Sequence, residues 1–467
     1  MHLPVSFTRQ RIFRSAFAML FLAATASTST ARTWHVSGTG DDAHSGTTAA
    51  TAFRTLQKAA GLIEPGDTVL IGNGVYQTPA KSPDGNVLTI DRSGRTDAWI
   101  VWKAAPGAHP ELRPTGWAGI AVTGSYHIID GLSVIGANDS LNLPDALADA
   151  RKLKPSARFN NNGILIDGRL RGPNEKPHHV IIRHCSVSKL PGGGIVALQA
   201  DYLTVEDCHV FENAWYMRYA GSGISTLGNW RFDDARGYHI VIQRNLVWNN
   251  KTLVPWERTS KLSDGNGIIL DVTEGEEEGG ATNPAADGAT SAKKPSATKS
   301  AKTPKPPRPA WTGRALIANN ISAYNGGSGI HTFRTKHVDI INNTTYWNGS
   351  VVGYQELFPN RSEDIVIFNN IIVPRPGGKV TSNSHNTTIR WDYNLYPVAQ
   401  TVFKGAHDLV ADPRFIDVQP DLRHGDFRLA AGSPGRDSGT DELALPADLL
   451  GRPRPGGSAR DRGAYEQ

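Results

Sequence analysis

The chain of 467 residues has only 2 cysteines and 3 methionines, and aromatic residues make up 8% of it. Two cysteines exclude a disulfide-dense scaffold, and no histidine lies near them at the spacing of metal ligands. Beyond the first residues, no apolar stretch approaches the roughly 20 residues that a membrane-spanning helix needs. The 48 glycines and 29 prolines favour a fold rich in turns over a helical bundle.

Residues 1–26 have the pattern of a secretory signal peptide. Three arginines between positions 9 and 14 precede a short apolar stretch, residues 16–24, and Ala24-Thr25-Ala26 has the form of a cleavage site. The apolar stretch is too short for a membrane anchor. We therefore expect an exported protein, secreted or periplasmic, with no membrane span.

The formal net charge is +5. In an exported protein a basic balance favours acidic partners such as uronic-acid polysaccharides, because the summed field concentrates anions. No motif indicates nucleotide, haem or nucleic-acid binding, and we expect a monomer.

The strongest pattern is a six-residue, β-branched strand that ends in Cys or Asn. Its copies end at Cys185, Cys208, Asn245, Asn320, Asn343 and Asn370, with an earlier copy at residues 126–131 and a degenerate one ending at Asn394.

A second strand opens with Gly-Ile, at residues 163–164, 194–195, 223–224, 267–268 and 329–330, and Gly353-Tyr354 is a variant of it. Cys185 and Cys208 are 23 residues apart, as are Asn320 and Asn343, and longer gaps are this unit with insertions. A fixed period of short strands indicates a solenoid. We predict an all-β fold, a single-stranded right-handed parallel β-helix over residues 33–400. An antiparallel sandwich would not repeat one polar residue at one offset.

The residue that ends each six-residue strand has a structural role. The asparagines should stack about 4.8 Å apart and hydrogen-bond along the solenoid as a ladder. Cys185 and Cys208 occupy the same position in successive coils, within disulfide range. Stacked free thiols are the simpler interpretation, and a bridge is the alternative.

Three segments lie outside the repeat. Residues 53–63 have the apolar spacing of a short amphipathic helix, which would cap the N-terminal end of the solenoid. Residues 274–311 run from an acidic block into an Ala-, Lys- and Pro-rich tract, and we expect a disordered insertion within one coil. Residues 401–467 should form a tail that packs on the solenoid.

The tail motifs Asp412-Pro-Arg-Phe415 and Asp461-Arg-Gly-Ala-Tyr-Glu466, with Gly66-Asp-Thr-Val69 near the start, carry a resemblance. The chain resembles the secreted bacterial right-handed parallel β-helix proteins, the superfamily of pectate lyases and other polysaccharide lyases. The resemblance implies an extracytoplasmic polysaccharide-active protein.

Insertions flank the Gly-Ile strand in the central coils, so we expect loops to form a groove over its outer face. Alternation predicts the outward residues of that strand. One row is Leu165, Val196, Ser225, Ile269, His331 and Gln355, and the other is Asp167, Leu198, Leu227, Asp271, Phe333 and Leu357.

These rows contain candidate catalytic groups for a lyase that acts on an acidic glycan. β-Elimination needs a base and a cation that stabilises the enolate. His331 would be the base and Arg334 or Lys336 the cation, with Asp271 orienting the imidazole. Alternatively, His331 is simply an exposed strand residue and Asp271 caps a turn.

Calcium is the cofactor that such a lyase could use, and Asp264 and Asp271 are the candidate ligands, although two acids supply few of the oxygens that the ion needs. The alternative is that Asp264 belongs to a solvated Asp-Gly turn. Pectate lyases with a Gly-Asn-Gly-aromatic-Lys strand place their base at that lysine. This chain has Gly265-Asn266-Gly267-Ile268, followed by Ile269 in place of the lysine. The resemblance therefore does not carry over that mechanism.

The insertion loops hold six aromatic and basic candidates for sugar stacking and carboxylate pairing, with two further basic residues close by. They are Trp215, Tyr216, Arg218, Tyr219, Trp230, Trp256, Arg258 and Lys261. The alternative is that these aromatics anchor the loops. Two other functions stay open: a glycoside hydrolase, which needs two carboxylates, and a non-catalytic glycan-binding protein.

Overall fold

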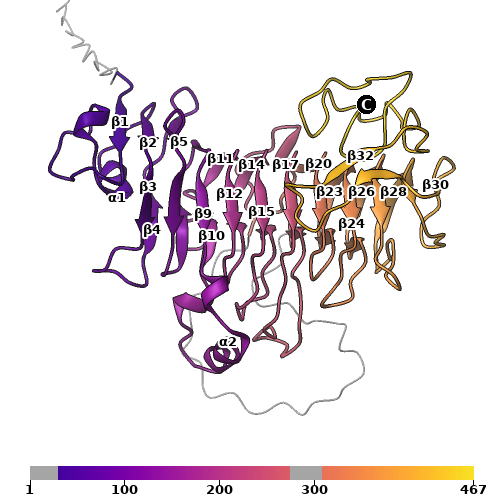
Figure 1. Cartoon of the computed structure of the whole chain (residues 1–467), viewed down its shortest axis with the longest axis horizontal. Helices are drawn as coiled ribbons and strands as arrows, with labels where there is room; N and C mark the ends of the chain where they lie inside the picture. Colours follow the sequence, from indigo (N-terminus) through magenta and orange to yellow (C-terminus); the bar gives the residue numbers. More distant parts are fainter. Residues whose placement is uncertain (1–29, 274–307) are drawn as a thin grey trace, which may run out of the picture. The chain divides into compact units, whose positions relative to one another are not determined.

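The computed structural model describes residues 30–273 and 308–467. The predicted signal peptide lies outside the described residues, as does most of the predicted insertion. Three parallel sheets wind around one apolar core, and each coil of the central region contributes one strand to each sheet (Figure 1). A parallel β-helix is therefore confirmed, whereas its right-handed winding stays a prediction. In the described part of the chain, no helix is long and apolar enough to cross a membrane.

Sheet A contains the six-residue strands of the repeat. Most of its inward residues in the central coils are β-branched or leucine and are buried, as Val180 and Ile182 are in β11. Its eleven strands, in order, are β1 (Thr33–Val36), β2 (Thr68–Ile71), β5 (Ile100–Ala104), β8 (His127–Asp130), β11 (His178–Arg183), β14 (Asp201–Glu206), β17 (Tyr238–Gln243), β20 (Arg314–Ala318), β23 (Lys336–Ile341), β26 (Glu363–Phe368) and β28 (Thr387–Asp392).

Sheet C contains the Gly-Ile strands. Its eight strands are β4 (Asn86–Ile90), β7 (Ala118–Val122), β10 (Asn162–Asp167), β13 (Ile195–Leu198), β16 (Ile224–Leu227), β19 (Ile268–Asp271), β22 (Ile330–Phe333) and β25 (Leu357–Asn360).

Sheet B is formed by short strands, which in the central coils directly follow the ladder residues, and the sequence pattern did not predict it. It extends past residue 400, the predicted end of the solenoid. Its eleven strands are β3 (Gly74–Gln77), β6 (Pro110–Arg113), β9 (Ser133–Ile135), β12 (Ser186–Ser188), β15 (His209–Phe211), β18 (Leu246–Trp248), β21 (Ile321–Ala323), β24 (Thr344–Tyr346), β27 (Ile371–Val373), β29 (Leu395–Tyr396) and β30 (Leu409–Val410).

Helices are few and short. The predicted helix at 53–63 is reduced to α1 (Leu56–Ala60), which begins at the N-cap Thr55 and buries Leu56 in the core. Its role as a cap stays a prediction. The other helical segments are the 3-10 turns η1 (Ala49–Thr51), η2 (Asn138–Ser140) and η3 (Ala157–Phe159) and the helix α2 (Leu143–Ala150).

The asparagine ladder is present between sheets A and B. Asn343 Oδ1 accepts hydrogen bonds from the backbone and side-chain nitrogens of Asn320, both at 3.0 Å. Asn370 Oδ1 accepts in the same way from Asn343, at 2.9 and 3.1 Å. Cys185 and Cys208 are buried free thiols in this structure, as the simpler interpretation predicts.

A second ladder follows the strands of sheet B. Its members are Asn213, Asn250, Asn325 and Asn348, in which each backbone N–H donates to the Oδ1 of the next member at 3.0–3.1 Å. Glu356 ends it, because its Oε1 accepts from the backbone N–H of Asn348 at 2.6 Å.

The C-terminal segment lies on the outer face of sheet B. It forms an antiparallel pair, β31 (Phe415–Asp417) and β32 (Asp426–Leu429), and its Leu422 and Phe427 pack with Phe211 and Trp248. The asparagine that precedes a ladder asparagine helps to hold this segment in place. Asn342, just before Asn343, donates from Nδ2 to the carbonyls of Asp461 and Gly463, at 2.9 and 3.2 Å.

Candidate functional site

The outer face of sheet C carries the predicted catalytic residues. The register places Ile269, His331 and Phe358 side by side in one row, and Asp271, Phe333 and Asn360 in the other. The prediction that Gln355 and Leu357 complete these rows is wrong. β25 begins at Leu357, which points into the core opposite Ile330, and Gly353-Tyr354 belongs to the preceding turn.

His331 is almost fully covered, with 5% of its surface exposed. Its ring stacks on Phe358, with 4.5 Å between centroids and 13° between planes. Neither ring nitrogen has a hydrogen-bond partner, and burial lowers the pKa of His331 to about 3. The imidazole is therefore neutral at neutral pH.

Asp271, at the end of β19, lies beside a second acid and two cations. Burial, together with the charge of Asp264, raises the pKa of Asp271 to about 8, and Arg334 and Arg308 partly offset this rise. Burial raises the pKa of Asp264 to about 7, although its Oδ1 accepts a hydrogen bond from Asn266 at 3.1 Å. At pH 7 Asp271 is mainly protonated.

The predicted contact between Asp271 and the imidazole is wrong in this structure. Asp271 Oδ1 is buried without a hydrogen-bond partner, as are both nitrogens of His331. Asn360 Oδ1, in the next strand, is also buried and unpaired. Because buried polar atoms are nearly always hydrogen-bonded in folded proteins, such a group on one face suggests a polar ligand.

The two candidate cations diverge. The Arg334 guanidinium lies over the ring of Phe333, 5.3 Å from its centroid, and its charge lowers the pKa of Asp271. Lys336 instead begins β23 of sheet A, where its Nζ pairs with Glu363 at 2.9 Å. The structure therefore brings Arg334, and not Lys336, to the acidic pair.

Calcium finds little support in the described residues. They contain no group of three or more His, Cys, Asp or Glu side chains that could hold a metal ion. Asp264 and Asp271 alone fall short of the six to eight oxygens that Ca²⁺ takes. The residues present therefore do not fit the ion, and no step is derived through it.

Two of the predicted sugar-stacking residues pack inside a loop cluster. Tyr216 is buried with Leu141, Phe159 and Val254, and Trp215 packs against the same cluster and donates from Nε1 to the carbonyl of Asn249 at 3.1 Å. These rings anchor α2 and its neighbouring loops, which matches the alternative interpretation.

The remaining loop candidates lie nearer the surface. Arg218 pairs with Glu257 at 2.6 Å and lies 5.8 Å from the ring of Tyr219, which is 37% exposed. Arg258 lies over Trp256, whose backbone N–H donates to the carbonyl of Lys261 at 2.9 Å.

Trp230 comes from a different loop, the one between β16 and β17. The Nζ of Lys176 lies 4.5 Å from the centroid of its ring. The predicted substrate-binding residues therefore come from loops before and after the sheet C strands.

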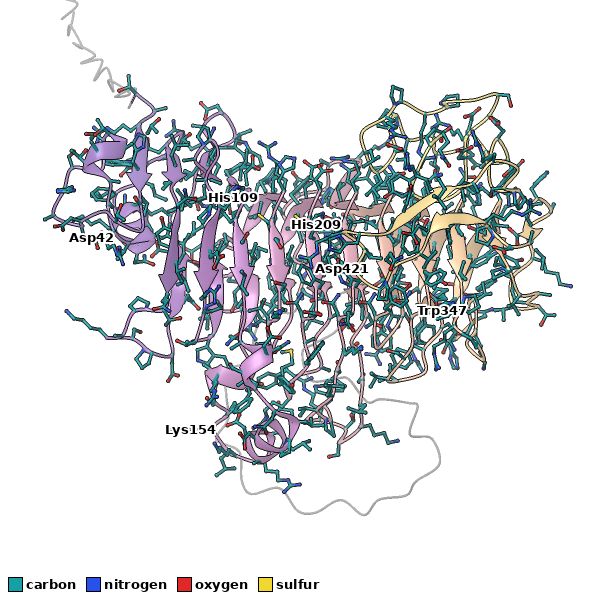
Figure 2. All side chains as sticks on the ribbon, viewed as in Figure 1. Asp42, His109, Lys154, His209, Trp347 and Asp421 are labelled. Carbon is teal, nitrogen blue, oxygen red and sulfur yellow. The ribbon has the colours of Figure 1, made fainter. Side chains whose placement is uncertain are left out.

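Two hollows in the described part of the chain lie over sheet B. One has a volume of about 1210 Å³ and a second of about 640 Å³, and Trp347 and Arg375 line both. Figure 2 labels three residues on this side of the solenoid: His209, Trp347 and Asp421. None of these residues was predicted from the sequence as a site residue. The available signal was the row of Lys189, Glu212, Asn249, Tyr324 and Trp347, each one residue before the second ladder position.

No protein-family model and no curated protein matches the chain. Among solved structures it is similar to pectate lyase Pel9A, at 16% identity and a TM-score of 0.52, over 94% of this chain and 97% of that one. It is also similar to a rhamnogalacturonan lyase, at 14% identity and a TM-score of 0.46, over 90% and 99% of the two chains.

A third similar structure is the GH136 lacto-N-biosidase from Eubacterium ramulus, at 15% identity and a TM-score of 0.41, over 78% of this chain and 64% of that one. The similarity to pectate lyase Pel9A shows the fold. The chain is a parallel β-helix of the kind found in that lyase, and its chemistry must be argued from its own residues.

Proposed function

We propose that this protein cleaves an acidic, uronic-acid polysaccharide by β-elimination, outside the cytoplasm, on the outer face of sheet C. The observation that carries the proposal is the group of buried, unpaired polar atoms of His331 and Asp271, beside Arg334. Strongly shifted pKa values clustered with a charge partner are typical of functional sites.

Arg334 and Asp271 would bind the uronate carboxyl group. Arg334 supplies a cation for its negative charge, and Asp271, whose pKa is about 8, is protonated at pH 7 and can donate a hydrogen bond to it. Both interactions strengthen when the proton leaves the adjacent carbon and the negative charge moves onto the carboxyl oxygens.

His331 would accept that proton. Its unpaired nitrogens are free of hydrogen bonds that would compete for the proton. Burial alone lowers the pKa of His331 to about 3, and a uronate carboxylate beside the ring would raise it, because an anion stabilises the imidazolium. The proton on carbon passes to the ring as the carbon–oxygen bond of the leaving sugar breaks and the double bond forms. The oxygen of the leaving sugar takes a proton from water, and the imidazolium then returns its proton to solvent.

The test is an assay of the full chain on a panel of uronic-acid polysaccharides, followed by the ultraviolet absorbance of the unsaturated product. His331→Ala should lower the rate by about 10²- to 10⁴-fold, the usual contribution of general acid–base catalysis. The matched control is His385→Ala, an exposed histidine beyond β25, which should retain full activity. Unchanged activity in His331→Ala would remove this base from the mechanism.

Glycoside hydrolysis is the second candidate, because the structure gives Asp271 an acidic neighbour. Asp264 lies in the loop that precedes β19, and its charge helps to raise the pKa of Asp271. With pKa values of about 7 and 8, Asp264 could serve as the carboxylate and Asp271 as the carboxylic acid of such a pair. New reducing ends without ultraviolet absorbance, lost in Asp264→Asn, would identify hydrolysis. Binding without any product would identify a glycan-binding protein.

A further inference from the structure

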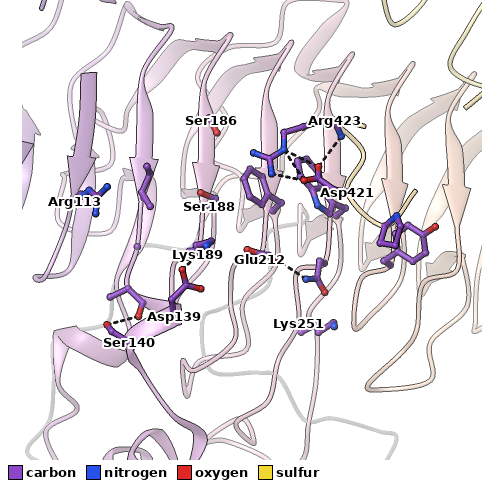
Figure 3. Close-up of a pocket in the computed structure, with 18 of the residues that line it drawn as sticks. Arg113, Asp139, Ser140, Ser186, Ser188, Lys189, Glu212, Lys251, Asp421 and Arg423 are labelled. Carbon is purple, nitrogen blue, oxygen red and sulfur yellow. Dashed lines mark hydrogen bonds and ion pairs between the residues drawn. The ribbon is translucent and has the colours of Figure 1, made fainter. Parts of the chain in front are cut away.

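The larger hollow lies on a different sheet from the proposed catalytic residues. Its floor is made by outward residues of β12, β15 and β18, such as Ser188 and Phe211. One wall is the turn with Asp139 and Ser140, and the other is the tail at Pro420, Asp421 and Arg423 (Figure 3). It is therefore closed by segments from distant parts of the chain.

Several residues that line this hollow already have interaction partners within the protein. Phe211 and Trp248 stack at 4.2 Å, and the Arg423 guanidinium lies 4.7 Å and 5.7 Å from their centroids. Asp421 holds Arg423 at 2.6 Å, and Lys189 pairs with Asp139 at 2.6 Å, both drawn as dashed lines in Figure 3. These groups shape the hollow without needing a ligand.

Two cations in the hollow have no carboxylate partner in the described part of the chain, although the Nζ of Lys251 lies over the ring of Trp215, 5.9 Å from its centroid. Among the described residues, neither Lys251 nor Arg375 has a carboxylate within ion-pair distance. Arg375 Nε is buried without a hydrogen-bond partner, and burial lowers the pKa of Lys251. Figure 3 shows Lys251 at the edge of the pocket. Both observations favour an anion as the missing partner.

An exposed aromatic ring lies between the two hollows. Trp347 follows β24, is 41% exposed and lies against Tyr346 at 5.2 Å and 14°. Lys251 follows β18 and Arg375 follows β27, which are three strands apart in sheet B. At about 4.8 Å between strands, the two cations are separated by roughly 14 Å along the solenoid, with Trp347 between them.

We propose that the two hollows over sheet B form a binding groove for an acidic polysaccharide, separate from the proposed catalytic face. A sugar ring stacks on Trp347, and Lys251 and Arg375 pair with acidic groups on neighbouring sugars. Only the choice of a uronic-acid ligand rests on the proposed function. Sulfated glycans share the recognising chemistry, so the test includes both.

The experiment is affinity electrophoresis of the full chain, which measures how far the protein is retarded in gels that contain polygalacturonate, a sulfated glycan or uncharged dextran. This readout needs no turnover, so it stands even if no lyase activity exists. We expect retardation by the acidic glycans but not by dextran, decreasing as salt is added. Trp347→Ala and Arg375→Ala should each weaken binding by about tenfold, as for the loss of one stacking or charge-assisted contact.

Controls keep the result interpretable. Trp117→Ala removes a similarly exposed tryptophan, 37% exposed, which directly precedes β7 of sheet C, and should bind as the unchanged protein does. Lys251→Ser tests the second cation independently, should Trp347→Ala prove unstable. The proposal is overturned if both cation variants bind normally, if dextran retards the protein equally, or if Trp117→Ala weakens binding as much as Trp347→Ala. His331→Ala should lose product formation and keep this binding.

Discussion

The imidazole of His331 lies face to face on the ring of Phe358, 4.5 Å away, and this contact helps to exclude water from both ring nitrogens. Burial is the cause of the low pKa of His331, about 3. Phe358→Ala should therefore raise that pKa toward the ordinary value of 6.5, which an NMR titration of the histidine would measure.

His127 provides an internal control for that titration. It is also buried, with a pKa lowered to about 4 mainly by burial, and it lies in β8 of sheet A. Its pKa should not move in Phe358→Ala. A titration of His331 that stays unchanged in the variant would show that other neighbours keep the ring dry.

The acidic pair predicts a dependence of stability on pH. Asp271 has an ordinary pKa of 3.8 and a folded pKa of about 8, so between these values the folded protein keeps a proton that the unfolded chain releases. This contribution makes stability fall as the pH rises from about 4 to 8. Asp271→Asn should therefore raise the melting temperature increasingly across that window, relative to the unchanged protein.

Asp167 gives a matched control of opposite sign. It occupies the same row of sheet C, but Arg169 hydrogen-bonds to it at 2.9 Å and holds its pKa below the ordinary value despite partial burial. Asp167→Asn should cost stability at pH 7, and this cost should shrink as the pH falls through the folded pKa. Equal shifts in the two variants at every pH would contradict the assignment.

The solenoid and its first ladder were predictable because both are local and periodic. Asn320 and Asn343 recur at one offset, and each makes the same contacts as its neighbours. The strands of sheet B were missed because three residues, such as Leu246–Trp248, are too short to show alternation. Gly353-Tyr354 imitated a Gly-Ile strand, and only tertiary pairing of Leu357 with Ile330 reveals the shift.

The sites depend on contacts that no repeat encodes. Asp264 reaches Asp271 through the path of an irregular loop, so sequence alternation could not pair them. The hollow over sheet B exists because Pro420 and Arg423 return from the tail to coils formed some 200 residues earlier. The spacing of residues along the sequence does not predict such long-range contacts.

The ladder predicts a large cost for one buried amide. Asn343 accepts two hydrogen bonds from Asn320 and donates to the carbonyl of Ile317 at 2.8 Å. Asn343→Ala leaves these buried groups unpaired, at about 1–3 kcal/mol each, so we expect a loss of about 3 kcal/mol or more in denaturant unfolding. The exposed Asn383→Ala should change stability by less than about 0.5 kcal/mol.

The two cysteines predict a simple chemical result. Cys185 and Cys208 are free and buried, and burial, with the neighbouring Cys185, raises the pKa of the Cys208 thiol well above its ordinary value. Because the thiolate is the reactive form, the native protein should not react with a thiol reagent such as Ellman's reagent. In the unfolded protein both cysteines should react with it without added reductant. Unfolded protein that reacts only after reduction would show that the two thiols are bridged.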